Sequence, residues 1–455
     1  MQSLCCSQHI YLETSTKIPG AAKVAFCFVL AGNFQDEVCS SLSVALRSAQ
    51  TRHAYLRSRV VRGSHKLKLF DSVSTPVSYL GHVEDKNLLC IGAQHVETEM
   101  NTYFDTDEDG NLILLKGAVL LSDSRCFVIL VMHHLICDGI SGMALCGEMA
   151  TAMLMLQANA KRDIPSLVED LQDQKLPANL SDIIRRNFSW PSRVYLGVKT
   201  LIKEILLPRP FVAFPIDRQL QHTNPSTSLI IRDFDCNHLR DFCKRHGTTV
   251  GAALDACVLV AAYLECRACC GHRDPLVLLL RSSFNVRPYF QVPQSQLGYF
   301  ASNLQYYHVF ANPTIDGSFL LNLACIQRKS TVEQLKAAPA TIAGWVSVKE
   351  WLSSLIVKKM HEGMLQPPAT CLVTNIGDQT TAAFSNCAAS VLQSFFCSTA
   401  NAWNTIEVSA VTHTSTVNSV MTLGFVFPRA LVSSTTALRF TSNTTKFLEL
   451  IQCVD

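Results

Sequence analysis

The sequence predicts an α/β protein of two sandwiches, because strands alternate with helices in both halves and nearly all of the chain has a composition suited to packing. Of its 455 residues, 48% are hydrophobic and 16% are charged, and no long Ser, Gly or Pro tract interrupts them. Since domains usually contain about 100–200 residues, this length favours two or more packed units. We therefore expect a globular protein with large cores.

The first half opens with the apolar run VAFCFVLAG, which predicts a strand. A helix is expected from about residue 36, with one apolar face formed by Val38, Leu42, Ala45, Leu46 and Ala49. The segment RHAYLRSRVV then turns back into a strand. Residues 112–121 and 126–132 are apolar runs joined by SDSR, and they predict a hairpin in a sheet buried on both faces.

The second strand of this hairpin runs into VMHHLICDGISG, residues 131–142, where two adjacent histidines precede an Asp-Gly pair. A helix is expected after this motif, and Ser141 is a plausible residue to cap it. The apolar spacing that predicts this helix is that of Leu145, Met149, Ala152, Met153 and Leu156.

A connection follows in EDLQDQKLPANLSD, and LPRPFVAFP is expected to be an extended crossing because its prolines forbid a helix. We therefore predict an N-terminal subdomain at residues 1–175, a crossover linker at 176–225 and a C-terminal subdomain at 226–455. The second subdomain opens with the strand SLIIRDF and a helix ending on Gly247. A Thr-started helix through Leu264 and the strand LVLLLR come next.

Charge and composition narrow the partners and the compartment. A formal charge of +3, without a Lys/Arg run, does not suggest nucleic acid, so we expect small-molecule partners. The first twenty residues lack the pattern of a signal peptide, and the apolar stretch 256–264 is far shorter than the ~18 residues of a membrane span. Most of the 19 cysteines lie inside apolar segments. We expect a reducing, cytoplasmic compartment and no membrane span.

Metal binding is disfavoured at each candidate site. Neighbouring side chains at a strand end point to opposite faces, so His133 and His134 would not grip one ion together with Asp138. A calcium loop is suggested by Asp105, Asp107, Asp109 and Gly110, but Lys116 stands where a bidentate Glu is needed, which favours a solvated turn. No second pair at zinc spacing accompanies the cluster Cys266, Cys269, Cys270 and His272.

Nucleophilic catalysis is also disfavoured. A triad of His134, Asp138 and Ser141 would place Asp, and not His, in the middle, and nothing indicates an exposed thiolate at Cys137. No G-x-x-x-x-G-K-[ST] loop supports nucleotide hydrolysis. His134 is left as a lone base, with a satisfied core histidine as the alternative. One imidazole, with an unperturbed pKa of about 6.5, is enough when the acyl group arrives as a thioester.

The segment HHLICDG matches the HHxxxDG signature of the condensation-domain and CoA-dependent acyltransferase superfamily. The sequence around it most resembles the stand-alone alcohol acetyltransferase and polyketide-associated acyltransferase members. Three further segments resemble landmarks of the superfamily in the same order, and the resemblance spans about residues 20 to 450. These segments are RHAYLRSRVV, SFNVRPYF and CLVTNIGD.

This resemblance implies two chloramphenicol-acetyltransferase-like subdomains in a V, with a tunnel between them and the motif at its centre. It implies that His134 is the general base and His133 supports the loop. Asp138, which precedes Gly139, would be structural and would pair with Arg287. The resemblance also assigns four residues to the substrate tunnel, with Thr374 replacing the usual Ser: Asn285, Thr374, Asn375 and Gly377.

The function implied is transfer of an acyl group from acyl-CoA, or from a carrier-bound thioester, to an alcohol. Acyl-CoA would be a co-substrate, no cofactor would stay bound, and an acyl carrier protein is a candidate partner. Two alternatives stay open. The same base would serve amide formation on an amine acceptor, and a non-catalytic binding or scaffold relative would keep the tunnel without turnover.

Overall fold

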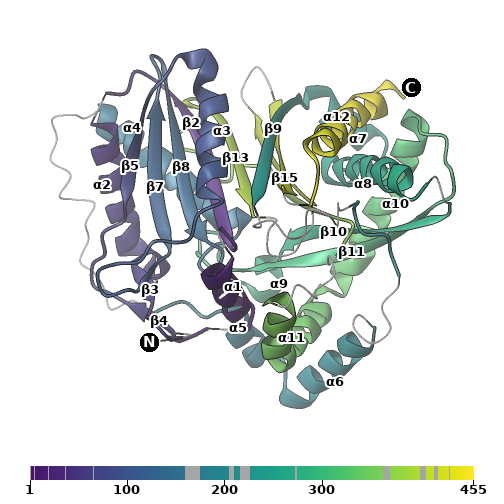
Figure 1. Ribbon diagram of the computed structural model, residues 1–455, viewed down its shortest axis with the longest axis horizontal. Helices are drawn as coiled ribbons and strands as arrows, with labels where there is room; N and C mark the ends of the chain where they lie inside the picture. Colours follow the sequence, from purple (N-terminus) through teal and green to yellow (C-terminus); the bar gives the residue numbers. More distant parts are fainter. Residues whose placement is uncertain are drawn as a thin grey trace.

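The computed structural model shows two α/β lobes side by side, with the N-terminus at one end of the molecule and the C-terminus at the other (Figure 1). It describes residues 2–4, 6–18, 20–35, 37–64, 66–158, 175–203, 210–215, 226–271, 274–361, 369–399, 406–414, 419–429 and 431–454. The predicted alternation of strands and helices in both halves is confirmed.

The first lobe is built on a five-stranded sheet in the order β13-β2-β8-β7-β5. Its strands are β2 (Lys23–Ala31), β5 (Val77–His82), β7 (Leu115–Leu121), β8 (Arg125–His133) and β13 (Val391–Ser398). The predicted β7–β8 hairpin is present, and β2 and β8 are buried on both faces. The helices α2 (Val38–Arg52) and α4 (Gly139–Ala158) cover one face, and α3 (Leu88–Glu99) covers the other (Figure 1).

A small second sheet corrects part of the predicted hairpin. Residues 112–121 do not form one strand, because β6 (Leu112–Ile113) leaves the main sheet and pairs with β3 (Ser58–Val60). The strands β4 (Lys66–Leu69) and β1 (Gln2–Ser3) complete this sheet. The short helices η1 (Ala54–Arg57) and η2 (Asp85–Asn87) precede β3 and α3.

The second lobe contains a six-stranded sheet in the order β11-β10-β12-β14-β15-β9. Its strands are β9 (Thr227–Asp235), β10 (Leu276–Asn285), β11 (Ala301–Phe310), β12 (Cys371–Asp378), β14 (Ile406–Thr414) and β15 (Ser419–Pro428). Helices α7 (Asn237–Arg245), α8 (Val250–Cys269), α10 (Gly317–Lys336) and α12 (Ser434–Leu450) pack on one face (Figure 1). The expected start of α8 is confirmed, since Thr249 Oγ1 caps it by accepting from Ala252 N at 3.1 Å.

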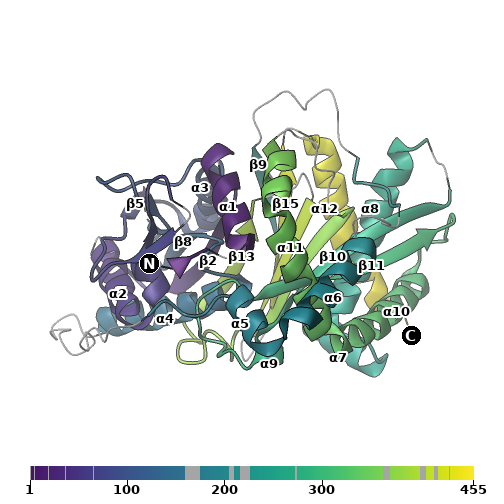
Figure 2. The same ribbon diagram turned by 90° about the horizontal axis from the view of Figure 1, so that it is seen from below.

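A third group of helices lies along the lower side of the molecule, where α11 (Ala338–His361) packs against both α1 (Cys6–Lys17) and α6 (Trp190–Leu201) (Figure 2). Helix α5 (Leu180–Asn187) also contacts α11. The short helices α9 (Arg287–Phe290) and η6 (Ile451–Cys453) complete the described elements. Helix α5 begins inside the segment expected to be only a connection, with Asn179 as its cap.

The described part of the proline-rich segment, residues 210–215, is not helical, as predicted. Val212 N donates to Val277 O at 2.7 Å, and Val212 O accepts from Thr370 Oγ1 at 2.6 Å. Residues 207–209 lie outside the described residues. The lobe that contains most of the predicted N-terminal subdomain also contains β13, which pairs antiparallel with β2 although it lies near the other end of the chain.

In the part of the chain that the structure describes, one helix has the length and apolar composition of a membrane span, or two if a bent pair of helices is counted as one span. Among the described residues, α4 passes this test alone, and half of it is buried inside the protein. The pair α7 and α8 passes only if counted together, across a bend of 100°. Helix α8, which contains the apolar stretch 256–264, is buried in the second core, as expected from the sequence.

Gly147 allows helix α4 to approach the chain that follows β12. A Cβ placed on Gly147 would lie 1.7 Å from the carbonyl oxygen of Ala383, which is a backbone atom and has no rotamer to change. This contact joins α4, which starts at the histidine motif, to a segment of the second half of the chain. The residue must therefore be glycine for the motif helix to lie where it does.

We predict that Gly147→Ala lowers the free energy of unfolding by about 1–3 kcal/mol or more, because overpacking against backbone outweighs the helix propensity gained. Gly251→Ala is the matched control, since it is also helical and its nearest neighbour is the movable Asn375 side chain, at 3.3 Å. Thermal or denaturant unfolding of both variants measures the difference. Equal stability of the two variants would contradict the close packing of α4.

Candidate active site

The histidine motif occupies the turn between β8, which ends at His133, and α4, which begins at Gly139. The two histidines face opposite sides, as expected for neighbours at a strand end. His133 packs on Phe104, with 4.6 Å between ring centroids, whereas His134 lies against Tyr11 and Tyr299. They therefore belong to different environments.

His133 is fully buried and holds the turn to helix α1. Its Nδ1 accepts from Leu135 N at 3.1 Å, and its Nε2 lies 3.0 Å from Ser15 Oγ. Because Ser15 Oγ donates to Leu12 O at 2.8 Å, the hydroxyl accepts the Nε2 proton. Burial lowers the pKa of His133 to about 3, so the ring is neutral.

The imidazole of His134 is held by a hydrogen bond between its Nδ1 and Cys137 O at 2.8 Å. Since a carbonyl oxygen only accepts, the proton sits on Nδ1, and Nε2 keeps its lone pair. The ring lies 4.9 Å from the Tyr11 centroid and 5.0 Å from that of Tyr299. Burial lowers the pKa of His134, and the bond to Cys137 opposes this in part. The imidazole is therefore a neutral base near pH 7.

Asp138 and Arg287 form a buried ion pair, with 2.8 Å between Oδ2 and Nη1. The same oxygen accepts from Phe300 N at 2.8 Å. Oδ1 accepts from Ser141 N and from Ser141 Oγ, each at 3.0 Å. Asp138 thus caps α4, which corrects the expectation that Ser141 would do so. The helix begins at Gly139, before Ser141. Ser141 Oγ in turn accepts a hydrogen bond from Asp138 N at 3.1 Å.

Neighbouring residues of the second lobe, to which Arg287 belongs, hold the arginine side chain in place. Its Nη2 donates to Gln296 O at 3.0 Å, and its guanidinium lies 4.8 Å from the Phe300 ring centroid. Asn285 Oδ1 accepts from Arg287 N at 3.1 Å and lies 3.3 Å from Nη1. The side chain that was expected in the tunnel therefore supports the arginine.

A cavity of about 110 Å³ lies beside His134. Of the other residues expected at the site, Asp138, Gly139 and Thr374 line it. Asn375 accepts from Gly377 N at 2.9 Å, and Gly377 has a positive φ of 74°, so this pair shapes a turn within β12. Further lining residues that the sequence did not single out are Tyr11, Lys23, Ser283, Tyr299, Asn303, Ser398 and Glu407. Of these, Ser283 is the first residue of the segment SFNVRPYF, and the other six lie outside the segments that carry the resemblance.

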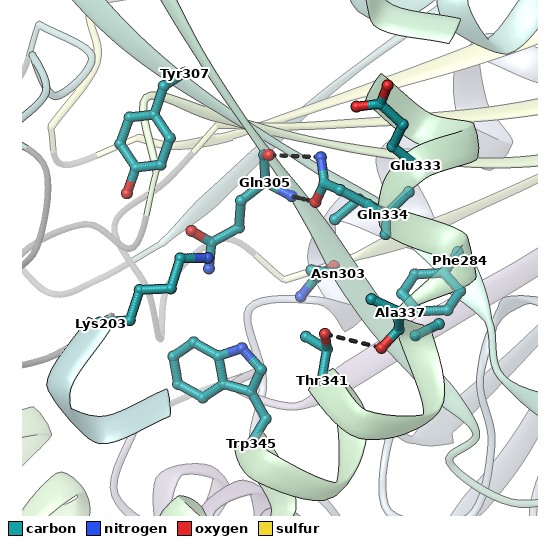
Figure 3. A pocket seen from close by; sticks show the side chains of 12 residues that line it. Lys203, Phe284, Asn303, Gln305, Tyr307, Glu333, Gln334, Ala337, Thr341 and Trp345 are labelled. Carbon is teal, nitrogen blue, oxygen red and sulfur yellow. Dashed lines mark hydrogen bonds between the residues drawn. The ribbon is translucent and has the colours of Figure 1, made fainter. Parts of the chain in front are cut away.

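Two more cavities follow strand β11 away from His134. One of about 90 Å³ shares Tyr299, Ala301 and Asn303 with the first cavity. The other, of about 580 Å³, shares Asn303, Gln305 and Trp345 with the second. Figure 3 shows this 580 Å³ cavity, with Lys203, Tyr307 and Trp345 around Gln305. The cavities therefore line up along β11 between α11 and His134.

The nucleophile alternatives do not fit this geometry. Asp138 bonds Ser141 and Arg287, while His134 bonds the Cys137 carbonyl, so no triad is formed. Burial raises the pKa of the Cys137 thiol well above its usual value.

The segments that the sequence offered as metal sites are not arranged as metal sites in the described residues. Asp107 Oδ1 accepts from Asn111 N at 2.8 Å in a turn with a left-handed Gly110, and Lys116 lies 3.3 Å from Asp105. No group of three or more His, Cys, Asp or Glu residues is placed to hold a metal ion within the described ranges. His272 of the cysteine-rich cluster lies outside them.

Residues 110–268, which contain the histidine motif, match the family model of alcohol acetyltransferase. No curated protein sequence matches the chain. The predicted resemblance to alcohol acetyltransferases is confirmed over these residues, and the likeness to condensation domains is one of fold.

Solved structures share the fold over almost the whole chain. The trichothecene 15-O-acetyltransferase TRI3 of Fusarium sporotrichioides is 12% identical, with a TM-score of 0.68, over 99% of this chain and 94% of its own. The condensation domain of the Monacolin K polyketide synthase MokA is 13% identical, with a TM-score of 0.65, over 99% and 97%. The first condensation domain of the calcium-dependent antibiotic synthetase is 13% identical, with a TM-score of 0.63, over 99% and 96%. The predicted fold is thereby confirmed.

We predict that Asp138→Ala lowers the free energy of unfolding by about 3–5 kcal/mol, because Arg287 would be left as a buried charge without its partner. Activity should fall with it, since the turn that carries His134 depends on the pair. Denaturant unfolding measures the loss. Glu84→Ala is the control, because Glu84 pairs with Lys86 on the exposed surface and should change stability little. An Asp138→Ala protein as stable as the control would contradict this role.

Proposed function

We propose that the protein is an acyltransferase that moves an acyl group from acyl-CoA to an alcohol, with His134 as general base. Acyl transfer in general is supported by the match of residues 110–268 to the alcohol acetyltransferase family. The observation that carries the mechanism is the neutral His134, fixed through Nδ1, beside a cavity. Its Nε2 keeps a lone pair that can accept a proton near pH 7, because the lowered pKa keeps the ring neutral.

In the proposed reaction, Nε2 takes the proton of the acceptor hydroxyl as the oxygen attacks the thioester carbon. A C–O bond forms, the C–S bond then breaks, and the proton passes from His134 to the departing thiolate. Both substrates must be present together, because no enzyme group holds the acyl chain. The aligned cavities along β11 offer space for two substrates around His134.

A thioester on an acyl carrier protein is the second candidate donor. Several proteins of the same fold are condensation domains of large synthases. The chemistry at His134 would be the same for both donors, and also for an amine acceptor that forms an amide. A panel of acyl-CoA and carrier-bound donors, with alcohol and amine acceptors, separates these cases by the mass of the product.

We predict that His134→Ala lowers kcat by about 10² or more and leaves donor binding nearly unchanged, because the base gains its interaction in the transition state. Initial-rate kinetics of the wild type should be sequential, without an acyl-enzyme in intact mass spectra. The surface variant His82→Ala is the control. Near-normal turnover of His134→Ala, or an acyl adduct on Cys137 or Ser141, would reject the mechanism.

The pH profile gives a further prediction. Because the pKa of His134 is lowered from the ordinary value of 6.5, the neutral form dominates at and above that pH. Therefore kcat/KM should stay level between about pH 7 and 8 and fall only on the acid side, as His134 becomes protonated. Measurement of kcat/KM from acid to mildly alkaline pH tests this. An acid limb centred above 6.5 would contradict the neutral environment described.

A further inference from the structure

A row of polar side chains crosses the cavity beside His134, and we name these five residues the polar ladder. They come from β11, β10, β12, β14 and β13, and they all line the 110 Å³ cavity that His134 also lines. In spatial order they are Asn303, Ser283, Thr374, Glu407 and Ser398. One small space is thus bordered by the base and by this row of hydrogen-bonding groups.

The polar ladder is continuously hydrogen-bonded. Ser283 Oγ donates to Asn303 Oδ1 at 2.8 Å, and Thr374 Oγ1 lies 3.1 Å from Ser283 Oγ. Thr374 Oγ1 also lies 3.4 Å from Glu407 Oε1, and Ser398 Oγ bonds Glu407 Oε2. Thr374 has one hydroxyl proton, so it cannot donate fully to both neighbours. The carboxyl of Glu407 therefore keeps hydrogen-bonding capacity that the ladder itself does not fill.

No cation of the described chain neutralises Glu407. Lys23 lines the same cavity, but its ammonium donates to Glu99 O at 2.7 Å and to Thr102 Oγ1 at 2.8 Å. Glu407 is 8% exposed, and its burial raises the pKa of the carboxyl. Buried polar groups usually have partners, and a carboxyl facing a substrate cavity has room for one in the substrate.

We propose that the polar ladder binds an acceptor that carries a second hydroxyl next to the one that is acylated, with Glu407 as the partner of that second hydroxyl. This rests on the proposed acyl transfer and adds the acceptor class, a polyhydric alcohol. A hydroxyl both donates and accepts, as the serine and threonine hydroxyls of the ladder do, whereas an ammonium only donates. An apolar alkyl chain at this wall would leave the unfilled hydrogen-bonding capacity of the Glu407 carboxyl without water or a partner.

The test compares acceptors that differ by one hydroxyl. Cyclohexanol is compared with cyclohexane-1,2-diol, and 1-hexanol is compared with hexane-1,2-diol. Acetyl-CoA is the donor, and ester formation is measured by mass spectrometry. The wild type should prefer the diols by about 10–100-fold in kcat/KM, because a site built to bond a hydroxyl disfavours the analogue that lacks it. Glu407→Gln should reduce this preference, and Glu407→Leu should bring it to within about twofold of unity.

The preference is a ratio within one preparation, so loss of folded protein does not change it. Glu148→Gln is the matched control, since Glu148 is a largely buried carboxylate that pairs with Arg52 and His53 and does not line the cavity. Its diol preference should equal that of the wild type. A wild type without a preference, or a Glu407→Leu variant that keeps it, overturns the assignment while acyl transfer stands. A wild type that acylates no acceptor at all rejects the proposed function, and this assignment with it.

Discussion

The buried ion pair between Asp138 and Arg287 is the constraint on which the site depends. The aspartate belongs to the turn before α4 in the first lobe, and the arginine follows β10 in the second. Burying two charges is costly unless their remaining hydrogen-bonding capacity is filled. Here the carboxylate accepts from Arg287, from Phe300 N and twice from Ser141. The carboxylate of Asp138 thus fixes the start of α4, the residue directly before β11 and the contact between the two lobes.

In the mechanism that we propose, this use of Asp138 leaves His134 to act as base without a carboxylate partner. A carboxylate bonded to Nδ1 would stabilise a protonated imidazole, whereas the Cys137 carbonyl fixes the ring and its tautomer without adding a full charge. The second histidine is kept neutral by burial and serves the shape of the turn through Ser15. In the proposed mechanism, His133 thereby supports the turn and His134 does the chemistry, which suits a reaction in which the acyl group is already activated.

Sequence patterns predicted what is local. The apolar spacing placed α2, the capping threonine placed the start of α8, and two apolar runs placed the β7–β8 hairpin. The strand-end argument separated the two histidines. Ser141 was mistaken for the cap because Asp and Ser both cap helices, and only the geometry shows which residue comes first. No sequence pattern marks Glu407 or Tyr11 as a site residue, because each reaches the cavity from an element far from the histidine motif in sequence. Asn285 was assigned to the tunnel because a motif gives position but not side-chain direction.

The strand β13 has a consequence for the order in which the protein is made and folded. Strand β2, near the start of the chain, pairs through residues 24–30 with residues 391–398, near its end. Because synthesis is slow compared with local folding, the first sheet must wait with an open edge at β2 until most of the chain has left the ribosome. That edge is apolar and unpaired during the wait, which makes it a surface for chaperones and for aggregation. The lobes are thus not independent modules, and a fragment that stops before β13 would expose this edge permanently.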